Sequence, residues 1–250
     1  MSGAFAWGVI ASSSLLLGAL LVMWRPVRQR TLGLVMAFGA GVLISAVAYE
    51  LVAEAVIVGG GGSGGQFWPV AAGLAAGALT FFAGDWYIDR LGGEKRKRSD
   101  QEAGGSALPL TLGIVLDGIP ESITLGLTLL AGQGVSAAML AAVFLSNLPE
   151  SMAATSGFEK SGRSRRWTIL LWLAIIVVSG LASLAGYSLL EDASGRTLAF
   201  VLAFAGGAVL TMLADTMMPE AFAYGGKLVG LLTTFGFAVA VAIVALEGAA

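Results

Sequence analysis

The sequence contains neither cysteine nor histidine. Without cysteine there are no disulfide bonds and no thiolate metal sites, and without histidine the commonest metal ligand and the usual proton carrier at neutral pH are missing. Charged residues make up only 12% of the 250 residues, whereas 57% are hydrophobic and the mean hydropathy is +0.86. Because a soluble domain of this length rarely carries so few charges, the sequence predicts an all-α, polytopic membrane protein.

Eight apolar segments are long enough to cross a bilayer, which takes about 20 residues. They cover residues 3–24, 31–57, 67–89, 107–131, 135–157, 167–190, 197–224 and 228–248. Thirteen of the fourteen Lys and Arg residues fall in the loops on one side, and only Arg196 falls on the other. Because cytoplasmic loops are enriched in Lys and Arg, we expect a multi-pass protein of the cell (inner) membrane with both termini outside.

Two loops differ from the rest in composition. Residues 90–106 are rich in Glu, Lys, Arg and Ser, which predicts a mobile cytoplasmic loop. Residues 59–65 read Gly-Gly-Gly-Gly-Ser-Gly-Gly, which predicts a flexible linker. The sequence does not say whether that linker is natural or engineered.

Two related motifs lie inside apolar segments. Residues 116–122 read Leu-Asp-Gly-Ile-Pro-Glu-Ser, and residues 145–151 read Leu-Ser-Asn-Leu-Pro-Glu-Ser. A proline inside a helix leaves the carbonyl four residues earlier without its N–H partner. Ionisable residues at membrane depth are costly and usually mark an ion or substrate path. The motifs therefore predict a binding site at two interrupted helices.

The polar residues of the two motifs share helix faces. Asp117 and Glu121 are four residues apart, as are Ser146 and Glu150, with Asn147 one step round. A tight connection near residues 131–134 would make the two segments antiparallel neighbours. Three carboxylates could then surround one divalent cation, with Ser146 and a freed carbonyl as neutral oxygen donors. The alternative is that these groups are protonated or hydrogen-bonded and only structural.

A weaker repeat relates two other segments. Residues 38–55 align without gaps to residues 204–221 at a constant offset of 166, with five of eighteen positions identical. Their opposite directions across the membrane predict an inverted repeat in one transmembrane domain, 1–250. Its 3+2+3 arrangement consists of residues 1–89, a central pair at 107–157, and residues 167–250. Glu54 would bind an ion at the outer side and Glu220 at the inner side, with interfacial solvation as the alternative for such acidic residues.

Small and soft side chains in these segments have simpler interpretations. Gly39, Gly41, Gly206 and Gly207 are expected to permit close helix packing. Three methionines are soft donors in principle, but core packing is the favoured interpretation for Met212, Met217 and Met218.

With these motifs the chain resembles the ZIP (Zrt/Irt-like) family of divalent metal transporters. Residues 117–122 are similar to its His-Asn-x-Pro-Glu-Gly pattern, and residues 146–151 to its second Pro-Glu pattern. The basic stretch 162–166 and residues 179–182 are similar to two further family motifs. The resemblance implies eight helices with both ends outside and an oxygen-only metal site of Asp117, Glu121 and Glu150. A second site would be reduced to Asn147 and shared carboxylates, because Ser183 stands where the family has a metal-bridging glutamate.

The expected function is transport of divalent transition-metal cations into the cytoplasm. Oxygen-only ligation accommodates zinc, which the resemblance favours, and also manganese, iron or cadmium. The metal is then the transported substrate, with no cofactor, no catalytic residue and no enzyme activity. The expected partners are metal ions and the lipid bilayer, with no nucleic acid, and a homodimer is left open. The alternatives are a ZIP-like protein that moves another solute or lacks transport, and an aspartyl hydrolase, for which residues 82–85 are a poor match.

Overall fold

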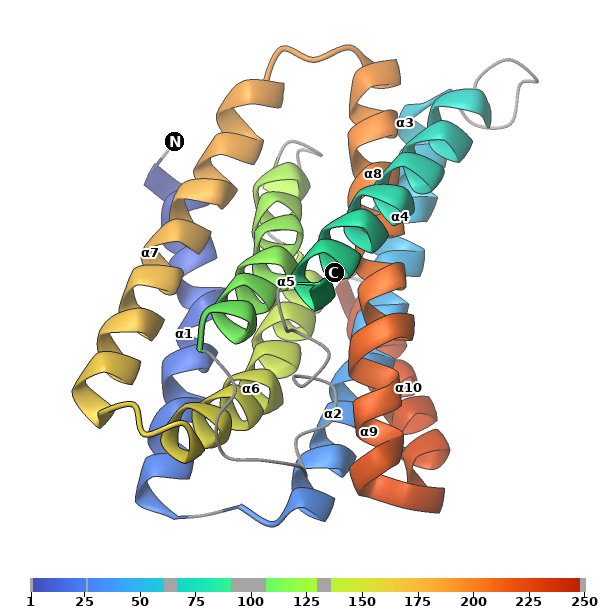
Figure 1. The fold of residues 1–250 in the computed structure, drawn as a ribbon. Helices are drawn as coiled ribbons and strands as arrows, with labels where there is room; N and C mark the ends of the chain where they lie inside the picture. The colour runs from blue at the N-terminus through green and yellow to red at the C-terminus, as the bar shows by residue number, and fades with distance from the viewer. Residues whose placement is uncertain (1, 26, 61–66, 91–106, 130–135, 248–250) are drawn as a thin grey trace.

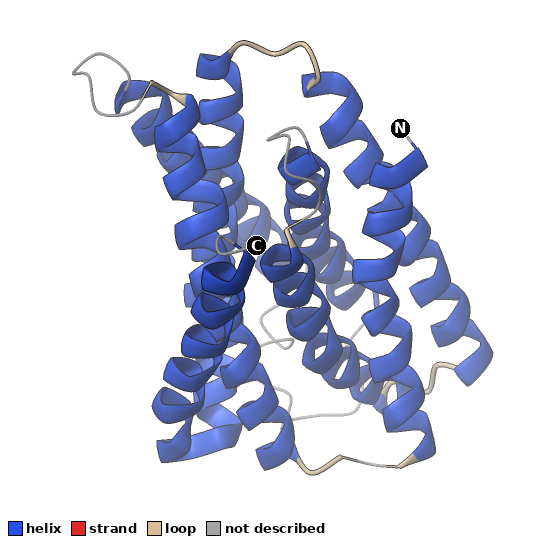
Figure 2. Ribbon diagram, turned by 180° about the vertical axis from the view of Figure 1, so that it is seen from behind, coloured by secondary structure: helices blue, strands red, loops and turns tan. Residues whose placement is uncertain are grey.

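The computed structural model describes residues 2–25, 27–60, 67–90, 107–129 and 136–247, and in these ranges the chain is all-helical with no strand (Figures 1 and 2). The side chains of a few residues inside these ranges, Asp117 among them, lie outside the description. The predicted mobile loop, the connection near residues 131–134 and most of the Gly-rich loop also lie outside the described residues.

Each of the eight predicted apolar segments coincides, in the described residues, with a helical stretch. The first three stretches are α1 (Ser2–Trp24), then α2 (Gln29–Ala46) continued by η1 (Val47–Ala53) and α3 (Glu54–Val58), and then α4 (Phe67–Arg90). The central pair is α5 (Ala107–Thr128) and α6 (Ala137–Lys160). The last three are α7 (Arg165–Leu190), then α8 (Gly195–Met212) continued by η4 (Leu213–Met217) and α9 (Met218–Gly225), and, after η5 (Gly226–Leu228), α10 (Val229–Glu247).

Several of these helices have the length and apolar composition of membrane spans. Within the described residues five stretches qualify, namely Gly3–Trp24, Gln29–Val58, Phe67–Arg90, Arg165–Leu190 and Gly195–Leu246. The last of these contains a reversal at Gly226, whose φ of 65° lies in the left-handed region that favours glycine. It therefore consists of two helical arms, α8–α9 and α10.

The helices form two groups that do not follow chain order. In the first, α1 packs against α6 and α7, and α5 packs against α7. In the second, α2 packs against α9 and α10, and α4 packs against α8 (Figure 1). Contacts of α2 with α6 and of α5 with α8 join the two groups.

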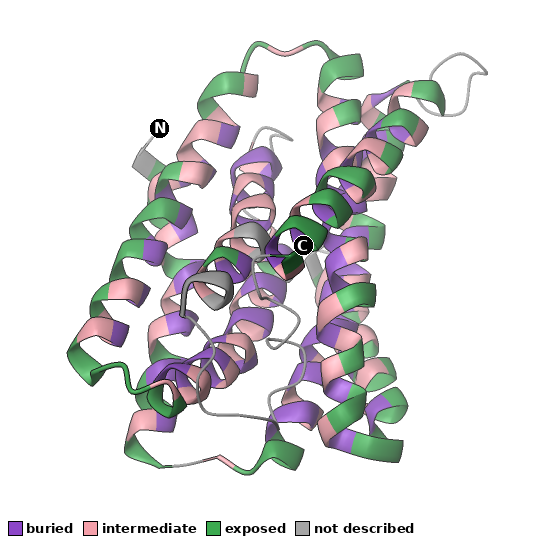
Figure 3. Cartoon of the chain, in the orientation of Figure 1, coloured by how far each residue is buried: buried purple, intermediate pink, exposed green. Residues whose placement is uncertain are grey.

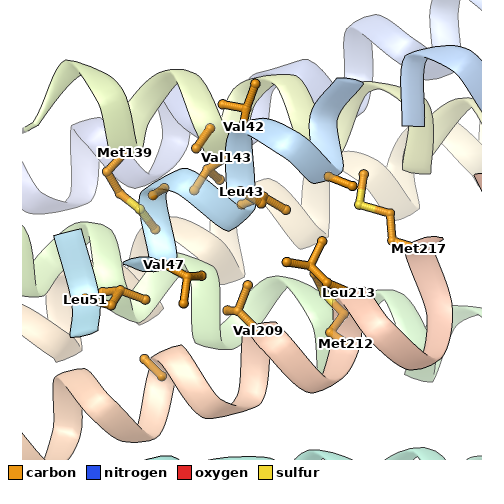
Figure 4. Close-up of a cluster of buried hydrophobic side chains, with 14 of the residues drawn as sticks. Val42, Leu43, Val47, Leu51, Met139, Val143, Val209, Met212, Leu213 and Met217 are labelled. Atoms are coloured by element: carbon orange, nitrogen blue, oxygen red, sulfur yellow. The ribbon is translucent and has the colours of Figure 1, made fainter. Parts of the chain in front are cut away.

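Exposed residues lie on the outside of both groups (Figure 3), and many of them are large and apolar. Examples are Leu79, Leu170, Leu181 and Phe235, each more than half exposed. Soluble monomers rarely expose so much contiguous apolar surface, whereas a bilayer solvates it. The main apolar core lies where α2, η1, α8 and η4 meet (Figure 4).

The weak sequence repeat has a structural counterpart. The stretch from α2 to α3 and the stretch from α8 to α9 run in opposite directions (Figure 1). Each turns from α-helix to π-helix at the same repeat position, at Val47 in the first and at Leu213 in the second. The core contacts shown in Figure 4 also use equivalent positions, because Leu43, Val47 and Leu51 align with Val209, Leu213 and Met217.

Neighbouring helices approach the two repeats through the same backbone contacts. In each repeat a phenylalanine carbonyl abuts a glycine of the partner helix, and a glycine three residues later abuts a partner carbonyl. The contacts are Phe38 with Gly236 and Gly41 with Thr233 between α2 and α10, and Phe204 with Gly77 and Gly207 with Leu74 between α8 and α4. The repeats thus exchange partners, because α2 of the first half packs on α10 of the second and α8 packs on α4.

Candidate functional site

The site is built on α5 and α6, each of which carries a proline inside the helix. Pro120 lies inside α5, and Pro149 lies inside α6. Neither residue has an N–H, so the carbonyls of Leu116 and Leu145 lose their normal helical donors. Both helices continue beyond the proline, which leaves an interrupted hydrogen-bond ladder within each helix.

Most of the predicted ligands on these helices are buried. Glu121, Ser146 and Asn147 are only 1%, 2% and 3% exposed, respectively, and Glu150 is half-buried. Asp117 lies within α5, but its side chain falls outside the description. Burying a carboxylate is costly, and ionisable residues inside apolar helices usually mark an ion path, so Glu121 is the leading candidate ligand.

Hydroxyl groups next to these residues donate to carbonyls of their own helix. Ser146 Oγ donates to the Val143 carbonyl at 3.1 Å, and Ser122 Oγ donates to the Gly118 carbonyl at 2.7 Å. A hydroxyl that donates in this way keeps acceptor lone pairs on its oxygen. Ser146 can therefore offer a neutral oxygen to a cation while its proton stays engaged.

Polar side chains are concentrated in the interior of one helix group. Of the fifteen buried polar or charged side chains in the described part of the chain, thirteen belong to α1, α5, α6 and α7. The exceptions are Ser45 and Asp85. The α2–α8 core, by contrast, is aliphatic and methionine-rich (Figure 4). The candidate ligands thus belong to the helix group with the polar interior, next to the apolar α2–α8 core.

Helix α2 lies against the interrupted part of α6 at a glycine. A methyl group placed on Gly39 would lie 3.3 Å from the Leu145 carbonyl oxygen, 3.3 Å from Ser146 Cα and 3.2 Å from Met217 Cε. These distances are at the tight end of van der Waals contact. Because Gly39 has no side chain, the backbone of α2 can approach the residues just before Pro149.

The two acidic residues predicted to flank the site occupy equivalent places. Glu54 is the first residue of α3 and Glu220 is the third residue of α9, and each of these two helices directly follows a π-helix. Both are half-buried. The α3 and α9 segments lie at opposite ends of the molecule (Figure 1). The structure therefore does not bring Glu54 and Glu220 together.

Ser183, which the resemblance to the ZIP family puts in the place of a metal-bridging glutamate, has a packing role. Ser183 is fully buried on α7, and its Oγ donates to the Ala4 carbonyl of α1 at 2.9 Å. This hydrogen bond joins α1 to α7.

The carboxylates are not gathered into one compact cluster in the described residues. No group of three or more acidic side chains in this part of the chain lies close enough to hold a metal ion. The predicted trio includes Asp117, which is outside the description, so this finding concerns only the other acidic residues.

Sequence reasoning missed the π-helices and the contact between Met217 and Gly39. A π-helical turn has no distinctive residue pattern over so short a stretch, although such turns are frequent at functional sites. The contact joins segments far apart in the chain, and no periodicity within one helix predicts it.

No protein-family model matches this chain, and no curated protein sequence matches it. In the residues that the structure describes, the fold is all-helical, and several helices are long and apolar enough to cross a membrane.

Proposed function

We propose that this chain is a ZIP-like membrane transporter that moves divalent transition-metal cations, with zinc as the preferred substrate, into the cytoplasm. The observation that carries the proposal is Glu121, a carboxylate with 1% exposure one residue after a helix-interrupting proline. Its counterpart Glu150 follows Pro149 in α6. Acidic residues beside interrupted helices are the usual means of holding a cation away from water in a bilayer.

The arrangement of the chain in the membrane belongs to the same proposal. Eight spans, with both termini outside and thirteen basic residues in the cytoplasmic loops, would place the α3 end of the molecule outside and the α9 end inside. Glu54 would then meet the ion on the outer side, and Glu220 would receive it on the inner side. The opposite directions of the two repeats support alternating exposure by rocking of the halves.

Each group would have a defined task. Asp117, Glu121 and Glu150 would replace water around the ion with carboxylate oxygens, and Ser146 and Asn147 would add neutral oxygens. The apolar α2–α8 core beside them would keep bulk water from following the ion. No chemical bond changes, so the protein only binds, dehydrates and releases its substrate.

Uptake into proteoliposomes tests the proposal. Glu121→Gln and Glu150→Gln keep side-chain size and remove the charge, so each should lower the initial rate of zinc uptake by at least about tenfold. Asp192→Asn is the matched control, because Asp192 is exposed in the turn between α7 and α8. Wild-type rates in both glutamine variants would contradict the proposal.

Thermal stability gives a second measurement that does not require transport. A cation that binds only the folded protein raises the unfolding temperature with its concentration. Zinc should therefore stabilise the purified wild-type protein and the Asp192→Asn control, and should stabilise the two glutamine variants less.

A further inference from the structure

The end of a buried methionine side chain lies against the same glycine as the part of α6 that carries the candidate ligand Ser146. A methyl group on Gly39 would touch Met217 Cε at 3.2 Å and the Leu145 carbonyl oxygen and Ser146 Cα at 3.3 Å each. Atoms from η4 and α6 therefore meet at the same point on α2. Figure 4 shows the Met217 side chain extending from its own helix towards α2.

Polar backbone and side-chain groups border the apolar core at this point. The Leu145 carbonyl is the one that Pro149 leaves without its helical donor, and Ser146 is a predicted ligand with 2% exposure. Met217 is itself 7% exposed, so its sulfur lies away from water. The end of the Met217 side chain, the Leu145 carbonyl oxygen and the backbone of Ser146 thus lie around the same point on α2, next to the proposed path.

We propose that Met217 is a specificity-determining residue, whose thioether contacts the cation as it passes Leu145 and Ser146. This inference rests on the proposed transport function and refines its substrate class. A site of oxygen donors alone suits hard cations such as manganese, whereas a polarizable thioether favours soft cations. Met217 therefore shifts the preference of an oxygen site towards cadmium and zinc and away from manganese.

The next residue provides a matched comparison. Met218 has the same side chain, but its sulfur accepts a weak hydrogen bond from Thr233 Oγ1 of α10 at 3.9 Å. It therefore points to a different neighbour from Met217. Leucine is close in volume to methionine and lacks the sulfur, so the same substitution at both positions isolates the effect of the Met217 thioether.

The experiment measures uptake of labelled Cd²⁺ and Mn²⁺ from one mixture into proteoliposomes. Met217→Leu should lower the ratio of cadmium to manganese uptake several-fold while manganese uptake continues, and Met218→Leu should keep the wild-type ratio. Met217→Cys restores a sulfur donor and should restore the cadmium preference. X-ray absorption of the Cd²⁺-loaded, purified protein should show a sulfur neighbour in the wild type and in Met218→Leu, and none in Met217→Leu.

The outcomes separate the two proposals. If Met217→Leu keeps both the wild-type uptake ratio and the cadmium–sulfur signal, the role of Met217 is overturned and transport stands. An equal loss of cadmium preference in Met217→Leu and Met218→Leu also overturns it. If the wild type neither takes up nor binds either cation, the transport function and the role of Met217 both fail.

Discussion

At Gly39 the backbone of α2 reaches the part of α6 whose hydrogen-bond ladder Pro149 interrupts. The sequence predicts that small residues here permit close packing, but it does not predict which helix is approached. That depends on tertiary contacts between segments far apart in the chain. The sequence predicts that Met217 packs in the core, and it does. The same limit explains why the sequence does not predict that the end of its side chain and the Ser146 backbone lie against the same glycine.

Adding a methyl group at Gly39 should impair transport more than folding. In Gly39→Ala the new Cβ meets the Leu145 carbonyl at 3.3 Å and Met217 Cε at 3.2 Å, so it crowds the proposed path. We expect zinc uptake to fall several-fold. Gly206→Ala is the control, because its Cβ would also meet a neighbour at 3.3 Å, in Val52, and its three nearest neighbours all belong to η1 rather than to α6. Equal effects of the two variants on uptake would show that crowding at α6 is not the cause.

The burial of most of the motif residues could be predicted from the sequence. Polar groups inside an apolar segment are costly to bury, so their presence indicates a functional role in the interior. Glu121, Ser146 and Asn147 are indeed buried. Whether their side chains converge on one ion is set by helix rotation and packing. The metal site therefore stays a prediction.

At the scale of elements, hydrophobic length alone predicts where the helices lie. In the described residues, the predicted segments coincide with helical stretches to within a few residues. Serine hydroxyls at Ser136, Ser164 and Ser194 accept the N–H of the residue three positions on, which fixes three of the starts. The π-helices η1 and η4 could not be predicted, because the change of period that they introduce is too short to detect among residues that are apolar on both sides of it.

Helix pairing by glycine gives a prediction about stability. In Gly41→Ala the new methyl group would collide with the Thr233 carbonyl of α10. Overpacking of this kind costs about 1–3 kcal/mol, so the unfolding temperature should fall. Gly230→Ala, on α10 itself, meets nothing within 4 Å and should leave stability unchanged or raise it slightly, because alanine favours helix by about 1 kcal/mol. A similar melting temperature for both variants would contradict the pairing.

For the whole molecule, the repeat suggested two related halves but not how they combine. Chain order divides the protein as three, two and three helices, whereas the contacts pair α2 with α10 and α4 with α8. Five identities in eighteen positions are the basis for the predicted repeat. They carry no information on which partner each segment packs against.

The proposed topology can be tested at the same scale, because the native chain has no cysteine to interfere. Asp192→Cys and Arg166→Cys place single thiols at exposed positions at the two ends of α7. With both termini outside, a membrane-impermeant maleimide should label Asp192→Cys in intact cells and Arg166→Cys only after permeabilisation. The reverse labelling pattern would invert the assigned direction of transport.

The exchange of partners between the halves also constrains how the protein is made. Helix α2 is synthesised before α4 to α9, whereas α10, the helix that matches its glycines, is synthesised after them. Until then the surface of α2 around Gly41 can be covered only by lipid or by a temporary neighbour. The native arrangement can therefore close only after α10 has been synthesised, and a chain truncated before α10 should be recognised as incomplete and degraded.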